Sequence, residues 1–188
     1  MQVDLSILIC TLEKRKTVFD VLIARLERQR DELSLGKRIQ ILSKCDNGEM
    51  SIGAKRNWLL DRAQGEYLCF IDDDDSVDEE YTKKIMEAIV DKPSCVMMIG
   101  VMNTNGQQRK RFEHSIKWWS YGEQNNVYFR PPNHLNPIRA DIARRFKFPE
   151  TDHGEDTDWA MQIRYSGLLE NEIEIDKVIY HYNYSSKK

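Results

Sequence analysis

Four consecutive aspartates, Asp72 to Asp75, follow directly on the apolar run 67–71. Adjacent carboxylates repel each other by about 1 kcal/mol per close pair in water, and by more where water is excluded. A strand that ends in such a cluster can hold a hard divalent cation, which binds oxygen ligands and shares them with a phosphate. The alternative is a solvated turn before a helix, because Ser76 and Glu79 have capping-box spacing. Capping would account for Ser76 and the last aspartate but not for the first three, so both readings stay open on this run alone.

The segments that position this run alternate between strand and helix. Strand-like apolar runs lie at 5–10, 39–43 and 67–71, and helical spacing lies at 17–33, 52–63 and 78–90. This order predicts a parallel sheet that is covered on both faces and joined by right-handed crossovers. Ligands bind beyond the carboxyl ends of such strands. Thr11, Asp46 and Asp72 should therefore share one rim, where they could hold a base, a ribose and a metal-bound diphosphate.

The second half of the chain has a different pattern. Strands are expected at 95–102 and 172–184, a hairpin turn at Asn105-Gly106, a loop at 115–137, and helices at about 138–146 and 155–165. The predicted fold class is α/β, with a mixed but mostly parallel sheet flanked by helices. The length of 188 residues suits a single domain, 1–188.

Composition narrows the possible partners and the compartment. A net charge of −3 gives no general attraction to nucleic acid or to an anionic membrane. The four cysteines lack CxxC spacing and are expected to be small buried residues in a reducing compartment. No apolar stretch approaches the roughly 18 residues that span a bilayer, and no signal-peptide pattern opens the chain. We therefore expect a soluble, cytoplasmic protein without a membrane span.

Four motifs, in a fixed order, carry a resemblance to a known family. They are the strand end Ser6 to Thr11, the segment Asp46-Asn47-Gly48, the segment Gly53 to Asn57, and the segment Gly65 to Asp75. In this order they resemble the GT-A glycosyltransferases, in particular family 2. A later Glu155-Asp156 pair at a helix start looks like the family's catalytic pair. The resemblance covers residues 3–90 and 133–165. It implies the Rossmann-like GT-A (nucleotide-diphospho-sugar transferase) fold, with a nucleotide-sugar half at 1–92 and an acceptor and catalytic-base half at 93–188.

The resemblance also implies an activity. It is metal-dependent, inverting transfer of a sugar from a nucleotide-diphosphate donor, expected to be a UDP-sugar, to a hydroxyl acceptor such as a glycan. The implied roles are Asp156 as general base with Glu155 beside it, donor contacts by Thr11, Glu13, Asp46, Arg56, Asp72 and Asp73, and Asp74 as ligand of Mn²⁺ or Mg²⁺. Three positions depart from the family pattern: Cys10 replaces a proline, Leu12 an aromatic residue that could stack on the base, and Glu13 an asparagine.

Several residues outside these motifs are further candidates. His181 lies where some GT-A enzymes place a metal-ligating histidine, although a paired strand histidine is the alternative. His134 precedes the helix at which family members meet the acceptor, and His153 adjoins the expected base and could tune it. Trp118 and Trp119 could form a stacking platform for an acceptor sugar, with core packing as the alternative.

Three other functions are consistent with parts of the sequence. A nucleotidyltransferase can share this fold, but it needs a glycine-rich phosphate loop, and residues 11–16 contain no glycine. A nucleotide- or glycan-binding module without transfer would use the same rim. A transferase acting on nucleic acid would use the basic cluster 109–111, for which a solvated hairpin is the simpler explanation, so nucleic acid is not an expected partner. The sugar, the acceptor, the linkage and the oligomeric state stay open.

Overall fold

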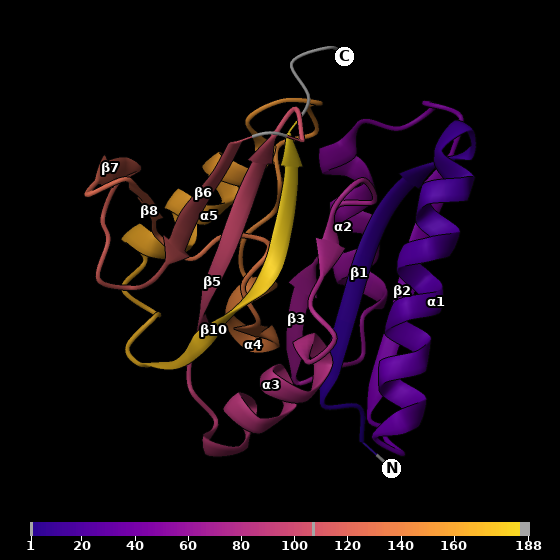
Figure 1. Cartoon of the computed structure of the whole chain (residues 1–188), viewed down its shortest axis with the longest axis horizontal. Helices are drawn as coiled ribbons and strands as arrows, with labels where there is room; N and C mark the ends of the chain where they lie inside the picture. Colours follow the sequence, from indigo (N-terminus) through magenta and orange to yellow (C-terminus); the bar gives the residue numbers. More distant parts are fainter. Residues whose placement is uncertain (1, 107, 185–188) are drawn as a thin grey trace.

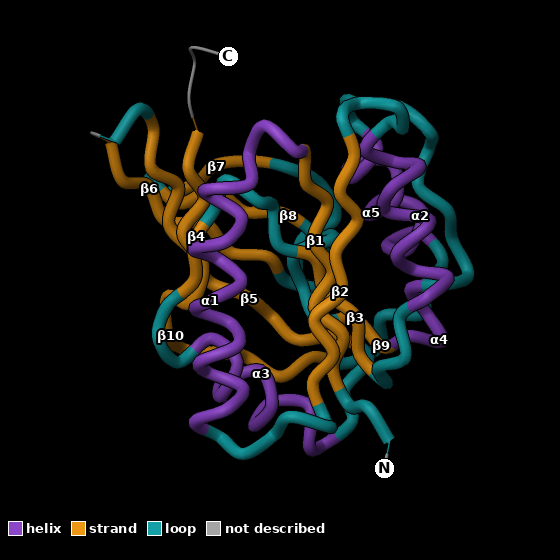
Figure 2. The backbone as a smooth tube through the Cα atoms, turned by 90° about the vertical axis from the view of Figure 1, so that its right-hand side faces the viewer, coloured by secondary structure: helices purple, strands orange, loops and turns teal. Residues whose placement is uncertain are grey.

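The computed structural model describes residues 2–106 and 108–184, and a mixed sheet with helices on both faces organises them. Its first part is the predicted parallel unit, in which β1 lies between β2 and β3. The strands are β1 (Leu5–Leu12), β2 (Ile39–Asp46) and β3 (Tyr67–Phe70), and the crossover helices are α1 (Lys16–Glu32) and α2 (Ile52–Arg62). A 3-10 turn, Glu13–Arg15, joins β1 to α1. Figure 2 shows α1 on one side of these strands and α2 on the other.

The second part extends the same sheet with both strand directions. Short β9 (Ile138–Arg139) pairs antiparallel with β3 and β5, and so joins the two parts. Long β10 (Glu172–Tyr184) runs parallel to β5 (Cys95–Thr104), as Figure 1 shows. The remaining strands are β4 (Ser76–Val77), β6 (Gln108–His114), β7 (Gly122–Gln124) and β8 (Val127–Arg130). The remaining helices are α3 (Tyr81–Ala88), α4 (Ala140–Ala143) and α5 (Glu155–Tyr165), with a 3-10 turn at Ile89–Asp91.

Three local expectations were wrong. The expected helix at 138–146 begins as strand β9 and shrinks to the four residues of α4, because its first residues pair with β3 and β5. The expected loop at 115–137 contains β7 and β8. Ser76 does not cap a helix, since it lies in β4 and pairs with β10; α3 starts later, after an Asx turn in which the Asp78 carboxylate accepts the Glu80 N–H.

Two apolar clusters fill the space on either side of the sheet. One lies between the sheet and helices α1 and α3 on one face, and the other lies between the sheet and helices α2, α4 and α5 on the opposite face. Three cysteines, at positions 10, 69 and 95, are buried in these clusters as expected, whereas Cys45 is exposed on the edge strand β2. No helix in the described part of the chain is long and apolar enough to cross a membrane. The packed faces leave the carboxyl ends of β1, β2 and β3 free to form a site.

Candidate functional site

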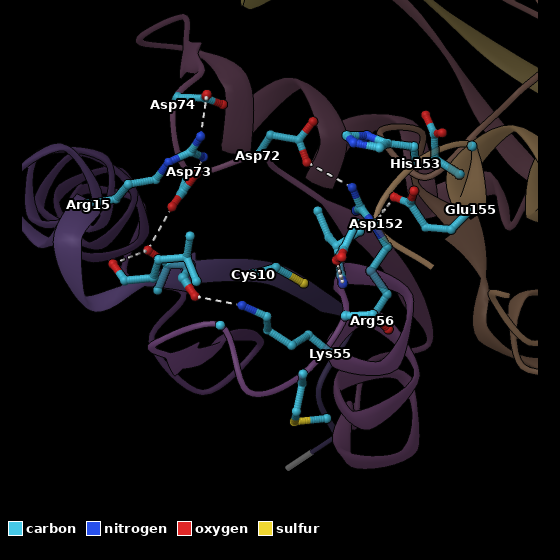
Figure 3. Close-up of a pocket in the computed structure, with 18 of the residues that line it drawn as sticks. Cys10, Arg15, Lys55, Arg56, Asp72, Asp73, Asp74, Asp152, His153 and Glu155 are labelled. Atoms are coloured by element: carbon cyan, nitrogen blue, oxygen red, sulfur yellow. Dashed lines mark hydrogen bonds and ion pairs between the residues drawn. The ribbon is translucent and has the colours of Figure 1, made fainter. Parts of the chain in front are cut away.

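A cavity of about 570 Å³ opens at the carboxyl ends of the parallel strands. Its walls come from the end of β1, the start of α2, the aspartate run after β3, the loop before α5 and the end of β10 (Figure 3). The expected site residues among its lining are Thr11, Arg56, Asp72, Asp73, Asp74, His153, Glu155 and Asp156. Segments far apart in the sequence therefore meet at the rim that the strand-end rule predicted.

The first three aspartates of the run differ in what surrounds them. Both carboxylate oxygens of buried Asp73 are engaged, one by the Thr11 hydroxyl at 2.7 Å and the other by Arg15 Nη1 at 2.6 Å. Arg15 also lies 3.4 Å from Asp74, whose side chain is 29% exposed toward the cavity. Asp73 is thus held inside the protein, while the Asp74 and Asp72 side chains are partly exposed and line the cavity.

The fourth aspartate has a structural role. Asp75 is buried, accepts a hydrogen bond from the Tyr180 hydroxyl at 2.7 Å and accepts another from the Asn183 N–H at 2.7 Å. Both donors belong to β10, so Asp75 ties the aspartate run to the second part of the sheet instead of serving the turn and helix that follow it.

This burial gives a pH prediction for stability. Burial, with the nearby Asp72 carboxylate, raises the pKa of Asp75 to about 8 against the two accepted hydrogen bonds. In the unfolded chain Asp75 loses its proton near pH 4. Between about pH 4 and pH 8 the folded state therefore binds more protons than the unfolded state. The contribution of Asp75 to the free energy of unfolding then falls as pH rises. Asp75→Asn should therefore gain stability relative to the wild type between pH 5 and pH 8, measured by urea denaturation. A pH-independent difference would contradict this assignment.

Arg56 connects the two sides of the cavity. Its guanidinium donates to Asp72 at 3.0 Å and to Glu155 at 3.2 Å, and it lies 5.1 Å from the centre of the Phe70 ring. Arg56 is 3% exposed. Although burial opposes the charged form of Asp72, Arg56 and His134 outweigh it and hold the pKa of Asp72 below its usual range. Asp72 is therefore an anion at neutral pH.

The Glu155-Asp156 pair opens α5, where negative charge is favoured by the helix dipole. Gly154, with φ +79°, turns the chain into the helix in a conformation that a side chain would strain. Glu155 is buried against Arg56, whereas the Asp156 side chain is 27% exposed and lines the cavity. Both residues line the cavity, and Asp156 is the more exposed of the two.

Two expected donor contacts lie just outside the cavity. Asp46 pairs with Lys55 Nζ at 2.5 Å and accepts the Gly48 and Met50 N–H groups, so it orders the loop after β2. Glu13 accepts a hydrogen bond from the Cys45 thiol at 3.4 Å. Lys55, which was not predicted, is in the lining instead, and its Nζ also donates to the Thr11 carbonyl at 3.1 Å. Its position next to Arg56 in the Gly53–Asn57 motif was the available signal.

The structure does not bring His181 to Asp74. In β10 the neighbouring Tyr180 and Tyr182 face the aspartate run and the cavity, and His181 points to the other side of the strand. There the pKa of His181 is lowered by burial, with Asp78 as the opposing charge. Among residues 2–106 and 108–184, no three histidine, cysteine or acidic side chains are grouped to hold a metal. The direction of the side chain gives no support to the expectation that His181 is a metal ligand.

The two tryptophans also lie away from the cavity lining. Trp118 packs on Phe129 with ring centres 4.6 Å apart, and Trp119 is 59% exposed with the Arg164 guanidinium 3.5 Å above its ring. His153 is exposed at the cavity, while His134 is buried between Asp72 and Asp156. An acceptor platform made by both tryptophans finds no support in this arrangement.

The acidic run has the oxygen ligands that suit a divalent cation. Mg²⁺ is usually held by one or two carboxylates together with substrate phosphates, so it does not require a protein cage of three ligands. Asp74, partly exposed at the cavity and beside Asp72 and Asp73, fits the role of such an anchor. In this structure Arg15 pairs with Asp73 and Asp74, and Arg56 pairs with Asp72.

Comparison with known proteins gives one family match and several structural matches for this chain. The model of the family described as "Glycosyl transferase family 2" matches residues 21–152. No curated protein matches the sequence. Crystal structures of S. aureus TarS residues 1–349 match the fold. The form with UDP-GlcNAc has 16% identity and a TM-score of 0.67, covering 99% of this chain and 60% of that one. The form with UDP has 18% identity and a TM-score of 0.66, covering 97% and 61%.

The chain spans about 60% of the length of these structures. At this identity the likeness shows the fold, which is GT-A-like with a mixed sheet and flanking helices, as expected. The family match extends over most of the sequence and includes the aspartate run and the Gly53–Asn57 motif. This chain belongs to glycosyl transferase family 2.

Proposed function

We propose that this chain transfers a sugar from a UDP-sugar to a hydroxyl acceptor with inversion, using Asp156 as the general base. One observation carries the proposal. A carboxylate at the start of α5 faces, in the same cavity, the acidic run at the end of β3. In support, the fold-related TarS crystal structure contains UDP-GlcNAc. Residues 1–92 would bind the donor, and residues 93–188 would supply the acceptor side and the base.

The donor would lie along the strand ends. Thr11, Lys55 and Arg56 give the cavity wall polar and cationic groups. Asp72 and Asp74, which line the same cavity, would face the sugar and diphosphate. A divalent cation held at Asp74 would neutralise the charge that develops on the leaving nucleoside diphosphate. Arg15 would release Asp74 while keeping Asp73. We expect Mn²⁺ or Mg²⁺ in this role.

The chemical step needs one base on the acceptor side. An acceptor hydroxyl attacks the anomeric carbon as its C–O bond forms and the bond to the diphosphate breaks. Asp156 takes the hydroxyl proton as the oxygen attacks. Because base and leaving group lie on opposite faces of the sugar, a single displacement inverts the anomeric centre. Glu155, fixed by Arg56, would keep the helix start in place.

A donor screen tests the proposal directly. Nucleotide sugars, UDP-linked first, should raise the thermal midpoint in the presence of Mn²⁺, because a ligand that binds only the folded state stabilises it. UDP release that depends on an added glycan would establish transfer. Binding without turnover on any acceptor would favour a non-catalytic module, and absence of nucleotide-sugar binding would contradict the donor assignment.

The metal anchor gives a second prediction. Asp74→Ala should weaken donor binding in Mn²⁺ and leave the weaker binding in EDTA unchanged, as measured by calorimetry. Asp91→Ala, an exposed aspartate away from the cavity, is the matched control. Equal donor affinity of Asp74→Ala and wild type in Mn²⁺ would remove Asp74 from the metal site.

A further inference from the structure

His134 lies between the two carboxylates that matter most for the reaction. Its Nε2 is 3.5 Å from Asp72 Oδ2, and its Nδ1 is 3.5 Å from Asp156 Oδ2. The residue is 4% exposed. Within the described part of the chain, neither ring nitrogen has a hydrogen-bond partner. A buried polar group without partners is costly, so such a group calls for an explanation.

The backbone around His134 is fixed. Its carbonyl accepts the Phe70 N–H at 2.7 Å, two residues before Asp72. Asn133 and Asn136 close the loop through their side chains, which accept the Leu135 and Asn133 N–H groups. The His134 ring meets the Phe70 ring edge-on, with centres 6.3 Å apart. The imidazole is therefore held by the same strand end that carries Asp72.

The contacts of Arg56 and His134 link Asp72 to both acids at the start of α5. Arg56 joins Asp72 to Glu155, and His134 joins Asp72 to the adjacent Asp156. A second cavity, of about 70 Å³, borders His134, Asp72 and Asp156 and leaves the ring room for a small shift. A distance of 3.5 Å exceeds a normal hydrogen bond, but catalytic hydrogen bonds are often long without substrate and shorten in the complex.

We propose that His134 is a positioning residue. Its ring holds the Asp156 carboxylate at a fixed distance and orientation relative to Asp72, so that the base stays aligned with the donor-facing carboxylate. The proposal rests on the proposed function of Asp156. It differs from the expected acceptor contact, because each ring nitrogen already faces a carboxylate and an acceptor hydroxyl would have to displace one of them.

The first test needs no substrate. The chain has four histidines, so ¹⁵N-histidine NMR resolves each ring. Asp156→Asn should shift His134 Nδ1 more than Nε2, and Asp72→Asn should do the reverse, while the His181 signals stay in place. Unchanged His134 signals in both variants would overturn the proposed contacts, whether or not the protein transfers sugar.

The second test replaces His134 by asparagine or glutamine, whose side-chain amides each imitate one nitrogen of the imidazole ring. An Asn amide nitrogen falls near Nδ1, on the Asp156 side, and a Gln amide nitrogen falls near Nε2, on the Asp72 side. His134→Ala should lower kcat about 10²-fold, the scale of a misplaced reacting group. His134→Asn should recover more of kcat than His134→Gln. Donor affinity should stay close to wild type, and His181→Gln, away from the cavity, should keep full activity.

The outcomes separate the two proposals. A wild type that transfers no sugar contradicts the proposed function, and the NMR result still decides the contacts. A wild-type kcat in His134→Ala overturns the positioning role alone. A raised acceptor KM with unchanged kcat would make His134 an acceptor contact and would also overturn it.

Discussion

Asp156→Asn is expected to lower sugar transfer by about 10²–10⁴-fold, the usual contribution of a general base, and to leave donor affinity almost unchanged. The amide has nearly the shape of the carboxylate but cannot take a proton from the attacking hydroxyl. The Asp156 side chain lines the cavity and has no salt bridge to lysine or arginine among the described residues, so its removal breaks no buried cation pair. Acceptor-dependent UDP release gives the rate, and calorimetry gives donor affinity.

The matched control lies two residues further along the same helix. Asp158 is also an acid in the first turn of α5, but it is exposed and does not line the cavity. Asp158→Asn removes the same charge from the helix dipole, which is worth about 0.3–1 kcal/mol, without removing the base. Equal losses in the two variants would show that Asp156 serves only the helix start, and normal transfer by Asp156→Asn would refute the base assignment.

The first half of the fold could be predicted because its signals are local. Short, mostly apolar runs of five or six residues, separated by segments with helical spacing, have one simple arrangement in a covered parallel sheet. The second half could not, because β9 exists only through pairing with β3 and β5, and β7 and β8 are short and contain no fully buried residue. Such long-range pairing leaves little trace in a single segment.

The edge of the sheet at which the site forms could be predicted, but the contacts of the individual side chains could not. The strand-end rule expected Thr11, Asp46 and Asp72 on one rim; Thr11 and Asp72 line the cavity, whereas Asp46 lies just outside it. The rule could not say which carboxylates are already engaged. Asp73 is bound by Thr11 and Arg15, and Asp75 turned out to be a buried tie to β10. The direction of His181 was equally hidden, because register shifts in β10 break the alternation that would have shown which face it takes.

The buried arginine at the centre of the site gives the largest expected effect on stability. Arg56→Met should lower the free energy of unfolding by about 3–5 kcal/mol, the cost of removing one partner of a buried ion pair. Domains are stable by only about 5–15 kcal/mol in total, so much of the protein's stability is at stake. Methionine keeps the packing against the Phe70 ring but leaves Glu155, which is 4% exposed, and Asp72 without their cation. Urea denaturation followed by tryptophan fluorescence measures the change.

A second substitution, Glu155→Gln, distinguishes a loss of charge pairing from a loss of packing, because the two predict opposite signs for its effect on stability in Arg56→Met. In the wild type, Glu155→Gln should destabilise the protein, because it weakens the bond from Arg56. In the Arg56→Met background the same change should stabilise it, since it removes an unpaired buried charge. Arg62→Met, at an exposed arginine of the same helix that stacks on Trp58, should change stability by no more than about 1 kcal/mol. If Glu155→Gln changed the free energy of unfolding in the same direction in both backgrounds, the stability lost in Arg56→Met would come from packing. The guanidinium charge would then not be what holds the two sides of the site together.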